Sequence, residues 1–391
     1  MRHRLTALLI VSLLIILLGC STAKKTVNSG TGFLFLATEG NTSLSAYAVS
    51  LSNGAISTNG SSVQTGGAPT AMVLSSAADA LFVSNQGSNS LCSAPCISSY
   101  TVDSGGGVKG ASTQSTGLGS APAGMAIDSG GKFLFVANQG TFSDPTSGTI
   151  SVFSIQGTTL SPVAGSPFLT ETAGETISTG PVALAAVGNY LYAANNFTNT
   201  ISAFSFDSTG ALTQLPTPTY ATGTAPVALA VSRTGAFLYV ANSGSNNVSA
   251  FAVCANASAT CPTVNGTLAE ITGSPFSAGL EPVSIVVDPA ADFVYVADRQ
   301  SNQISEYQAS SGTGALSPLS PAAVSTGLNP VSVAVQPFGG YVFAADAGGA
   351  TISTFSVAST TVGTTTTFSG ILSPVTNTLS TGGQPSAVIA R

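Results

Sequence analysis

Charged residues are scarce in this sequence: of 391 residues only 6% are Asp, Glu, Lys or Arg, against roughly a quarter in ordinary soluble domains. A long amphipathic helix needs such residues on its solvent-exposed side, so the composition argues against a largely helical fold. The sequence has no cluster of five or more Lys and Arg. Because phosphate contacts need clustered positive charge, we expect no nucleic-acid partner.

Histidine and tryptophan are equally rare. There is no Trp, and the single His is His3, close to the N-terminus. If that terminus is removed, no histidine remains to act as a general acid or base. A zinc site is also disfavoured, because neither His nor a CxxC spacing is available. The P-loop and the GxSxG nucleophile elbow are missing as well, so two common catalytic frameworks are excluded.

The N-terminus has the parts of an export signal. A basic start, MRHR, precedes the uncharged apolar stretch 5–19, and Cys20 follows directly. The segment LLGC at 17–20 resembles the bacterial lipoprotein box, which implies cleavage before Cys20 and lipid attachment to it. The alternative is an uncleaved anchor helix. Either interpretation places the rest of the chain in the bacterial cell envelope, on the periplasmic side or the cell surface, with a membrane partner reached through Cys20.

One apolar pattern recurs along the rest of the chain, ending in Asn or Asp in six copies and in Thr in the first. The copies are LFLAT at 34–38, LFVSN at 81–85, LFVAN at 134–138, LYAAN at 191–195, LYVAN at 238–242, VYVAD at 294–298 and VFAAD at 342–346. Their starts lie between 47 and 57 residues apart, which is typical of a four-stranded propeller blade. The sequence therefore predicts an all-β, seven-bladed β-propeller of four-stranded antiparallel blades.

A second pattern predicts how the ring closes. Each blade is expected to begin with an apolar innermost strand led by a proline: Pro69, Pro122, Pro181, Pro226, Pro282, Pro330 and Pro385. The chain stops at PSAVIAR, residues 385–391, an innermost strand with nothing after it. The first blade starts at 33 without such a strand. Pairing the C-terminal strand with the N-terminal blade would remove both exposed edges.

We therefore divide the chain into three parts: residues 1–19 are the signal peptide, 20–32 the acylated Cys and a polar tether, and 33–391 the propeller. The repeated strands of 33–391 resemble the seven-bladed lactonase-type propellers related to 6-phosphogluconolactonase and the YVTN-repeat surface propellers. That resemblance implies lactone hydrolysis by His, Arg and Glu side chains around a central pocket. This sequence departs from the pattern, because the propeller has no His and only three arginines, Arg233, Arg299 and Arg391.

By propeller topology, the loops after the repeated strand and the loops before each leading proline lie on one face, here named the loop face. The Asn or Asp that ends the repeated strand is expected to form an Asx turn, accepting a backbone N–H two residues further on. As an alternative, a ring of such amides would bind sugars or other small polar ligands.

An acidic sector is expected on the loop face where the sixth, seventh and first blades meet. Asp298, Asp346 and Glu39 follow the repeated strands of those blades, and Glu281 and Arg299 lie nearby. Carboxylates of this kind could hold Ca²⁺ or supply a base beside Arg299 for lactone hydrolysis. The alternative is that they are solvated turn residues on one side by chance.

Four cysteines besides Cys20 are expected to form two local disulfides. Cys92 and Cys96 lie four apart, and Cys254 and Cys261 lie seven apart in a different blade. Four cysteines allow three pairings, and two local bridges fit a propeller best. They are expected to be oxidised outside the cytoplasm.

Two functions from different classes remain open at this stage. The first is a lipid-anchored binding or interaction protein of the cell envelope, with a small polar ligand or a protein partner on its loop face. The second is a lactone hydrolase acting on sugar-acid lactones through carboxylates and Arg. The absence of His favours the first function, and the resemblance favours the second.

Overall fold

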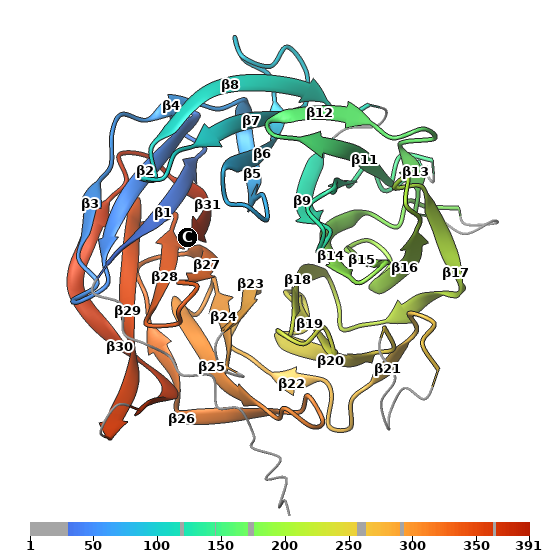
Figure 1. The fold of residues 1–391 in the computed structure, drawn as a ribbon. Helices are drawn as coiled ribbons and strands as arrows, with labels where there is room; N and C mark the ends of the chain where they lie inside the picture. The colour runs from blue at the N-terminus through green and yellow to red at the C-terminus, as the bar shows by residue number, and fades with distance from the viewer. Residues whose placement is uncertain are drawn as a thin grey trace, which may run out of the picture.

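The computed structural model is an all-β ring of seven antiparallel sheets around a central axis (Figure 1). It describes residues 30–117, 121–144, 146–170, 176–255, 263–289, 293–362 and 365–391. The segment 1–19 predicted to be a signal peptide, Cys20 and most of the predicted tether lie outside these ranges. Across the described part of the chain, no helix is long and apolar enough to span a membrane.

The innermost strand of every blade is short and faces the axis. These strands are β5 (Gly67–Leu74), β9 (Pro122–Ile127), β14 (Pro181–Val187), β18 (Pro226–Val231), β23 (Pro282–Val287), β27 (Pro330–Val335) and β31 (Pro385–Ala390). Six of the seven begin at the proline, as expected, because the first residue of a strand can lack an N–H without loss of a ladder hydrogen bond.

The second strand of each blade carries the repeated apolar motif and is the most deeply buried part of the molecule. These strands are β1 (Thr31–Thr38), β6 (Ala80–Gly87), β10 (Phe133–Asn138), β15 (Tyr190–Asn195), β19 (Phe237–Asn242), β24 (Phe293–Asp298) and β28 (Tyr341–Asp346). In β10, β19, β24 and β28 every residue of the strand is buried. Both sides of this strand therefore contact neighbouring blades.

The third strand of each blade alternates buried apolar and small polar residues. These strands are β2 (Ser43–Ser50), β7 (Cys96–Val102), β11 (Thr149–Gln156), β16 (Thr200–Phe206), β20 (Asn247–Val253), β25 (Gln303–Ala309) and β29 (Thr351–Val362). Alternation at period two is what a strand with two different faces requires.

The outermost strand differs between blades. It is continuous in β8 (Val108–Ser115), β17 (Leu212–Ala221), β26 (Leu316–Ser325) and β30 (Thr365–Ser380). In the first, third and fifth blades it is broken into β3 (Ile56–Thr58) and β4 (Val63–Gln64), β12 (Thr159–Pro162) and β13 (Phe168–Leu169), and β21 (Leu268–Glu270) and β22 (Phe276–Ser277). Short, interrupted outer strands limit the exposed edge available for pairing with other chains.

The predicted closure is confirmed. Strand β31 pairs with β1 in antiparallel register, from Leu34 opposite Ala390 to Thr38 opposite Pro385. Beyond the ladder, Phe33 and Arg391 exchange both backbone hydrogen bonds, at 3.0 and 2.8 Å. The first blade is thus made from the two ends of the propeller, which lie side by side in Figure 1.

Adjacent blades are locked together by a repeated contact between a glycine and an aromatic ring. The glycine lies in the hairpin between the third and outermost strands, at positive φ, and the ring begins the second strand of the preceding blade. The pairs are Gly54 with Tyr341, Gly106 with Phe33, Gly210 with Phe133, Gly266 with Tyr190, Gly314 with Phe237 and Gly370 with Phe293. A Cβ on any of these glycines would lie 2.2–2.7 Å from the ring, so only glycine fits.

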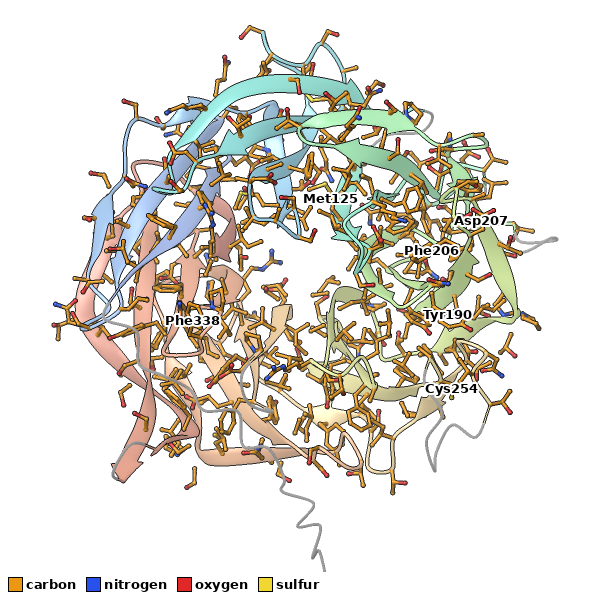
Figure 2. The ribbon with its side chains drawn as sticks, in the orientation of Figure 1. Met125, Tyr190, Phe206, Asp207, Cys254 and Phe338 are labelled. Carbon is orange, nitrogen blue, oxygen red and sulfur yellow. A yellow bond between two sulfur atoms is a disulfide. The ribbon has the colours of Figure 1, made fainter. Side chains whose placement is uncertain are left out.

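In three neighbouring blades a tyrosine hydroxyl strengthens the same junction. Tyr192, Tyr239 and Tyr295 donate to the carbonyls of Gly266, Gly314 and Gly370, at 2.8, 3.0 and 2.8 Å. All three tyrosines are fully buried. A buried hydroxyl needs a partner, and here that partner belongs to the next blade. Figure 2 shows the radial order, with Met125 of an innermost strand near the axis and Asp207, in a hairpin turn, towards the rim.

We predict that Gly314→Ala destabilises the fold far more than Gly157→Ala. Both glycines have positive φ, 72° and 60°, but a Cβ at Gly314 would meet the Phe237 ring, whereas Gly157 faces open space because Ala80 replaces the aromatic residue there. The strained backbone alone costs about 1–2 kcal/mol, and the overlap with the ring adds a further ~1–3 kcal/mol. Urea unfolding of both variants measures the difference, and equal losses would contradict a blade-locking role for the contact.

Candidate functional site

The Asn and Asp residues that end the repeated strands are structural, and the expected Asx turns are wrong. Asn195 Nδ2 donates to Thr200 Oγ1 and Ser202 Oγ at 3.0 and 2.8 Å, both on the following strand. The same pattern occurs at Asn85, Asn138 and Asn242, which are all fully buried. The side chain lies between strands because it ends a strand that is covered on both faces. The amides therefore do not form a ligand-binding ring.

Asp298 and Asp346 replace this asparagine in the sixth and seventh blades. Their Oδ2 atoms accept hydrogen bonds from Ser305 and Ser353, both at 2.6 Å. Both residues are fully buried, and their Oδ1 atoms have no hydrogen-bond partner among the described residues. Burial raises the pKa of Asp298 and of Asp346 to about 6, although the serine hydrogen bonds act in the opposite direction. Neither carboxyl is accessible to a substrate.

Glu281 and Arg299 form an ion pair on the loop face. The Arg299 guanidinium Nη2 contacts Glu281 Oε1, and the two side chains are 44% and 32% exposed. The Arg299 backbone N–H also donates to the Glu281 carbonyl at 2.8 Å, so backbone and side chain join the same two residues. The neighbouring carboxylate raises the pKa of Arg299, which stays charged. This pair is a cation and a carboxylate that solvent and a ligand can reach.

The backbone of Glu281 has a left-handed conformation and is hydrogen-bonded to the neighbouring blade. Its φ is 58°, a left-handed conformation that glutamate rarely adopts. Asn246 of the fifth blade accepts the Glu281 N–H at 2.8 Å, and Asn302 makes the equivalent bond to Asn329 at 2.7 Å. Because Ala225 has the same conformation and the same type of contact, the geometry belongs to the blade, and only the glutamate side chain is particular to this position.

The residues just before the leading prolines differ in size and polarity between the two sides of the loop face. They are small in the second to fifth blades, namely Ala68, Ala121, Gly180 and Ala225. In the sixth, seventh and first blades they are Glu281, Asn329 and Gln384, with Asn329 and Gln384 exposed. An acidic sector was expected at the closure, and the structure adds the amides of Asn329 and Gln384 to Glu281 there, forming a polar sector.

Glu39 lies in the same sector without joining a cluster. Its side chain is exposed, and its N–H donates to the Gln384 carbonyl at 2.9 Å. Asp298 and Asp346 are turned into their own blades, and Glu281 is engaged by Arg299. In the described residues no three Asp, Glu, His or Cys side chains come close enough to hold a metal ion. Calcium therefore remains a prediction, with no ligand set assembled for it here.

Glu306 is a buried acid that the sequence analysis missed. It lies on β25 in the register that Ala203 and Ala250 occupy in other blades, and it is fully buried. Its Oε2 accepts the backbone N–H of Leu372 in the next blade at 2.9 Å. Burial raises its pKa to about 7. The signal was a charged residue where the equivalent positions of other blades hold uncharged ones such as Ala203, Ala250 and Val152, and its contact links two blades.

The described cysteines are consistent with the predicted local disulfides. Cys92 and Cys96 form a disulfide, with their Cα atoms 6.2 Å apart. Cys254 also takes part in a disulfide and lies towards the rim in Figure 2. Cys261 lies outside the described residues, as does Cys20. The Cys92–Cys96 bridge staples the loop before β7.

Comparison with known families and structures identifies relatives by sequence and fold. The family model described as a lactonase with a seven-bladed β-propeller matches residues 145–269 and 256–378, which together exceed half of the chain. No curated protein matches the sequence.

Solved structures resemble the whole propeller. A candidate 6-phosphogluconolactonase from Bacteroides fragilis is 20% identical, with a TM-score of 0.73 over 94% of this chain and 99% of that one. The periplasmic gluconolactonase of Pseudomonas aeruginosa is 19% identical, with the same score over 92% and 99%. Hydrazine synthase of Kuenenia stuttgartiensis also matches, at 16% identity and a TM-score of 0.55 over 83% and 95%. At such identities the likeness shows the fold alone, and this fold serves different chemistries.

The buried carboxyls of Asp298 and Asp346 should make the stability of the fold depend on pH. Because the folded-state pKa values of Asp298 and Asp346 lie near 6, above the usual 3.8, the stability they contribute is complete below about pH 4 and is lost as the pH rises through 6. We expect Asp298→Asn and Asp346→Asn to be more stable than the parent chain at pH 8, each by about 1–3 kcal/mol, and equal to it near pH 4. Asparagine already fills this site in four blades.

Denaturant unfolding across pH 4–8, with and without Ca²⁺, measures both effects. A parent chain that Ca²⁺ stabilises, and variants that have lost this response, would support calcium binding instead. Variants less stable than the parent at pH 8 would contradict the structural role of the two carboxyls.

Proposed function

Because this chain belongs to the family of seven-bladed β-propeller lactonases, we propose that it hydrolyses a lactone on its loop face. The observation that carries the proposal is the exposed Glu281–Arg299 pair within the polar sector of that face. It supplies a carboxylate and a permanent cation in contact, on elements fixed by the blade backbone. Both groups are accessible, unlike Asp298 and Asp346.

Ester hydrolysis needs a general base and a group that stabilises the developing oxyanion, and the Glu281–Arg299 pair can supply both. Glu281 accepts a proton from water as the water oxygen attacks the lactone carbonyl carbon. Arg299 donates to the carbonyl oxygen as it becomes negative. The ring C–O bond then breaks, and the leaving oxygen takes the proton back from Glu281. The product is an open-chain hydroxy acid.

The absence of histidine determines which group acts as the base. From residue 4 onward the chain contains no His, so the histidine chemistry implied by the family resemblance has no counterpart. A carboxylate is the remaining proton acceptor on this face.

Exposed amides support a sugar-acid lactone as the substrate class. Asn329 and Gln384 lie on the next two blades, in the positions equivalent to Glu281. Amide groups both donate and accept hydrogen bonds, as sugar hydroxyls require. The name of the Pseudomonas aeruginosa relative, a periplasmic gluconolactonase, is consistent with this class.

A noncatalytic binding role is the competing proposal, and one feature favours it. Leu280 and Leu328, which directly precede Glu281 and Asn329, are 49% and 59% exposed. Large exposed apolar side chains beside polar groups are typical of surfaces that contact a ligand or a protein. The same face would then bind a partner without turning it over.

The assay of purified protein against glucono- and 6-phosphogluconolactone separates these proposals. We expect turnover that Arg299→Gln lowers by about 10²-fold or more and Glu281→Gln by about 10²–10⁴-fold. Arg233→Gln is the matched control, since Arg233 lies in a turn on the opposite face, and should leave kcat/KM unchanged. Absence of turnover by a folded parent protein would favour the binding role, and full activity in both loop-face variants would place the reaction elsewhere.

We also propose that the chain is exported and held at a membrane by lipid on Cys20. The support is the order of basic start, apolar stretch and lipoprotein-like box described above. Labelled palmitate should enter the protein in a bacterial host, and it should be absent from Cys20→Ser, which should also leave the membrane fraction. Membrane association without label in the parent chain would favour the uncleaved anchor helix.

A further inference from the structure

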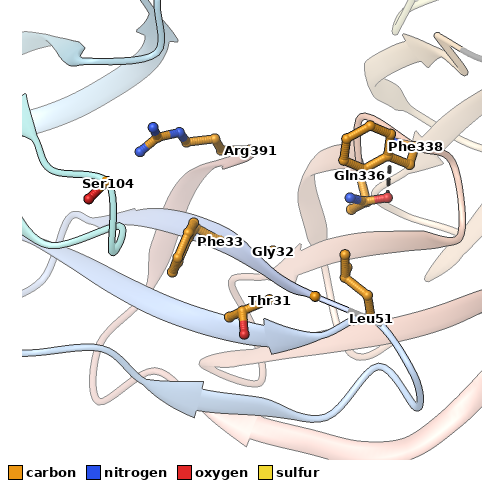
Figure 3. Close-up of a pocket in the computed structure, with 9 residues that line it drawn as sticks. Thr31, Gly32, Phe33, Leu51, Ser104, Gln336, Phe338 and Arg391 are labelled. Carbon is orange, nitrogen blue, oxygen red and sulfur yellow. Dashed lines mark hydrogen bonds between the residues drawn. The ribbon is translucent and has the colours of Figure 1, made fainter. Parts of the chain in front are cut away.

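A cavity of about 190 Å³ lies on the face opposite the loop face, at the junction between the seventh, first and second blades (Figure 3). Its walls come from β1, from the turn after β27 and from the end of the chain after β31. The lining includes Phe33, Ser104, Gln336, Phe338 and Arg391. It is separate from Glu281 and Arg299, which lie on the loop face.

Gln336 brings a buried donor to this cavity. Its side chain is 2% exposed, and its Oε1 accepts the backbone N–H of Phe338 at 3.0 Å. That bond orients the amide, so Nε2 points away from Phe338, as Figure 3 shows. Nε2 has no hydrogen-bond partner among the described residues. A buried donor without an acceptor is costly.

The same position in other blades shows why the extra donor is unusual. Ser75, Asp128 and Ser232 follow the innermost strands of the second, third and fifth blades, and their oxygens accept backbone N–H groups of the turn. The turn therefore needs only an acceptor. Gln336 Oε1 accepts the N–H two residues further on, as Asp128 Oδ2 does from Gly130, and the side chain adds an NH₂ group that the turn does not use.

Arg391 supplies a positive charge across the cavity. Its Nη1 donates to the Asp103 backbone carbonyl at 2.8 Å, and the guanidinium carbon lies 6.0 Å from the centre of the Phe33 ring. Within the described ranges it makes no ion pair with a carboxylate side chain. Its remaining N–H groups are available in a molecule whose net charge is negative.

Gly32 lines the cavity and lies against Leu51, Gln336 and the Arg391 backbone. A Cβ on Gly32 would lie 3.0 Å from Leu51 Cδ2, 3.5 Å from the Arg391 carbonyl oxygen and 3.8 Å from Gln336 Cγ. Gly32 is not at positive φ, so its backbone conformation does not require glycine. The missing side chain leaves space beside Gln336 and Arg391 instead.

We propose that this cavity binds a small organic carboxylate. Gln336 Nε2 donates a hydrogen bond to a carboxylate oxygen, and the Arg391 guanidinium supplies the positive charge that favours an anion in the same cavity. The rings of Phe33 and the half-exposed Phe338 contact the organic part of the ligand. The cavity volume restricts the ligand to fewer atoms than a drug-sized molecule has.

Titration with benzoate, benzamide and inorganic phosphate tests the assignment, observed through the Gln336 side-chain amide in ¹⁵N-resolved NMR spectra and by calorimetry. Benzoate should bind in the millimolar range and shift the Gln336 Nε2 signals. Neutral benzamide should bind at least about tenfold more weakly, because charge-assisted hydrogen bonds are the stronger kind. Phosphate, which leaves the aromatic rings uncovered, should also bind more weakly.

Three variants assign the binding to this cavity. Gln336→Glu keeps the acceptor for the Phe338 N–H but places a negative charge next to the ligand, so benzoate affinity should fall about tenfold or more. Arg391→Gln should have a similar effect, and Gly32→Ala should reduce binding by filling part of the cavity. Arg299→Gln, on the loop face, should bind benzoate as the parent does, whatever its effect on lactone turnover.

Several outcomes would overturn the proposal. They are absence of benzoate binding by the parent chain, equal binding of benzamide or phosphate, and benzoate binding that survives both Gln336→Glu and Arg391→Gln. Thermal unfolding of each variant shows that it is folded at the temperature of the titration. Loss of benzoate binding in Arg299→Gln alone would place the carboxylate at the lactone site and also overturn it.

Discussion

The ring depends on the contact between a hairpin glycine of one blade and the aromatic ring that begins the second strand of the preceding blade. Six of the seven junctions have it. Each sheet is too small to bury both faces by itself, and a propeller solves this by stacking sheets side by side. The glycine–ring contact sets how closely two sheets approach, and the buried tyrosine hydroxyls of the fourth to sixth blades fix the same distance.

Close stacking has a consequence for charge. The second and third strands are covered on both faces, so an ionisable side chain placed there is removed from water whatever its function. Asp298, Asp346 and Glu306 show the result, since burial raises the pKa of all three. The groups that remain accessible are at the turns. Glu281 and Arg299 on one face, and Arg391 on the other, are charged side chains that a polar ligand can reach.

Membership of the lactonase family narrows the chemistry but does not supply its residues. Sequence identities near 20% with the similar structures show a shared fold, and the absence of histidine after His3 leaves that side chain unavailable as a general base in the propeller. The two faces also differ in kind. The loop face offers an exposed ion pair with neighbouring amides, whereas the opposite face has a cavity lined by Gln336, Arg391 and two aromatic rings. The first suits a reaction in contact with water, and the second suits retention of a small anion.

By itself, the sequence determined the number of blades, the order of strands and the closure through β31 and β1. These follow from period-two alternation, repeat spacing and proline position, which are local properties of the chain. It also predicted an acidic sector where the sixth, seventh and first blades meet. Only the tertiary structure decided which side chains of that sector are accessible. Asp298 and Glu281 look alike as acids near the ends of neighbouring segments. One lies at the end of a strand covered on both faces, and the other in a turn, so the packing of adjacent blades buries the first and exposes the second. The donor of Gln336 was likewise invisible in the sequence, because its significance depends on the turn N–H that occupies its oxygen and on residues from three blades around it.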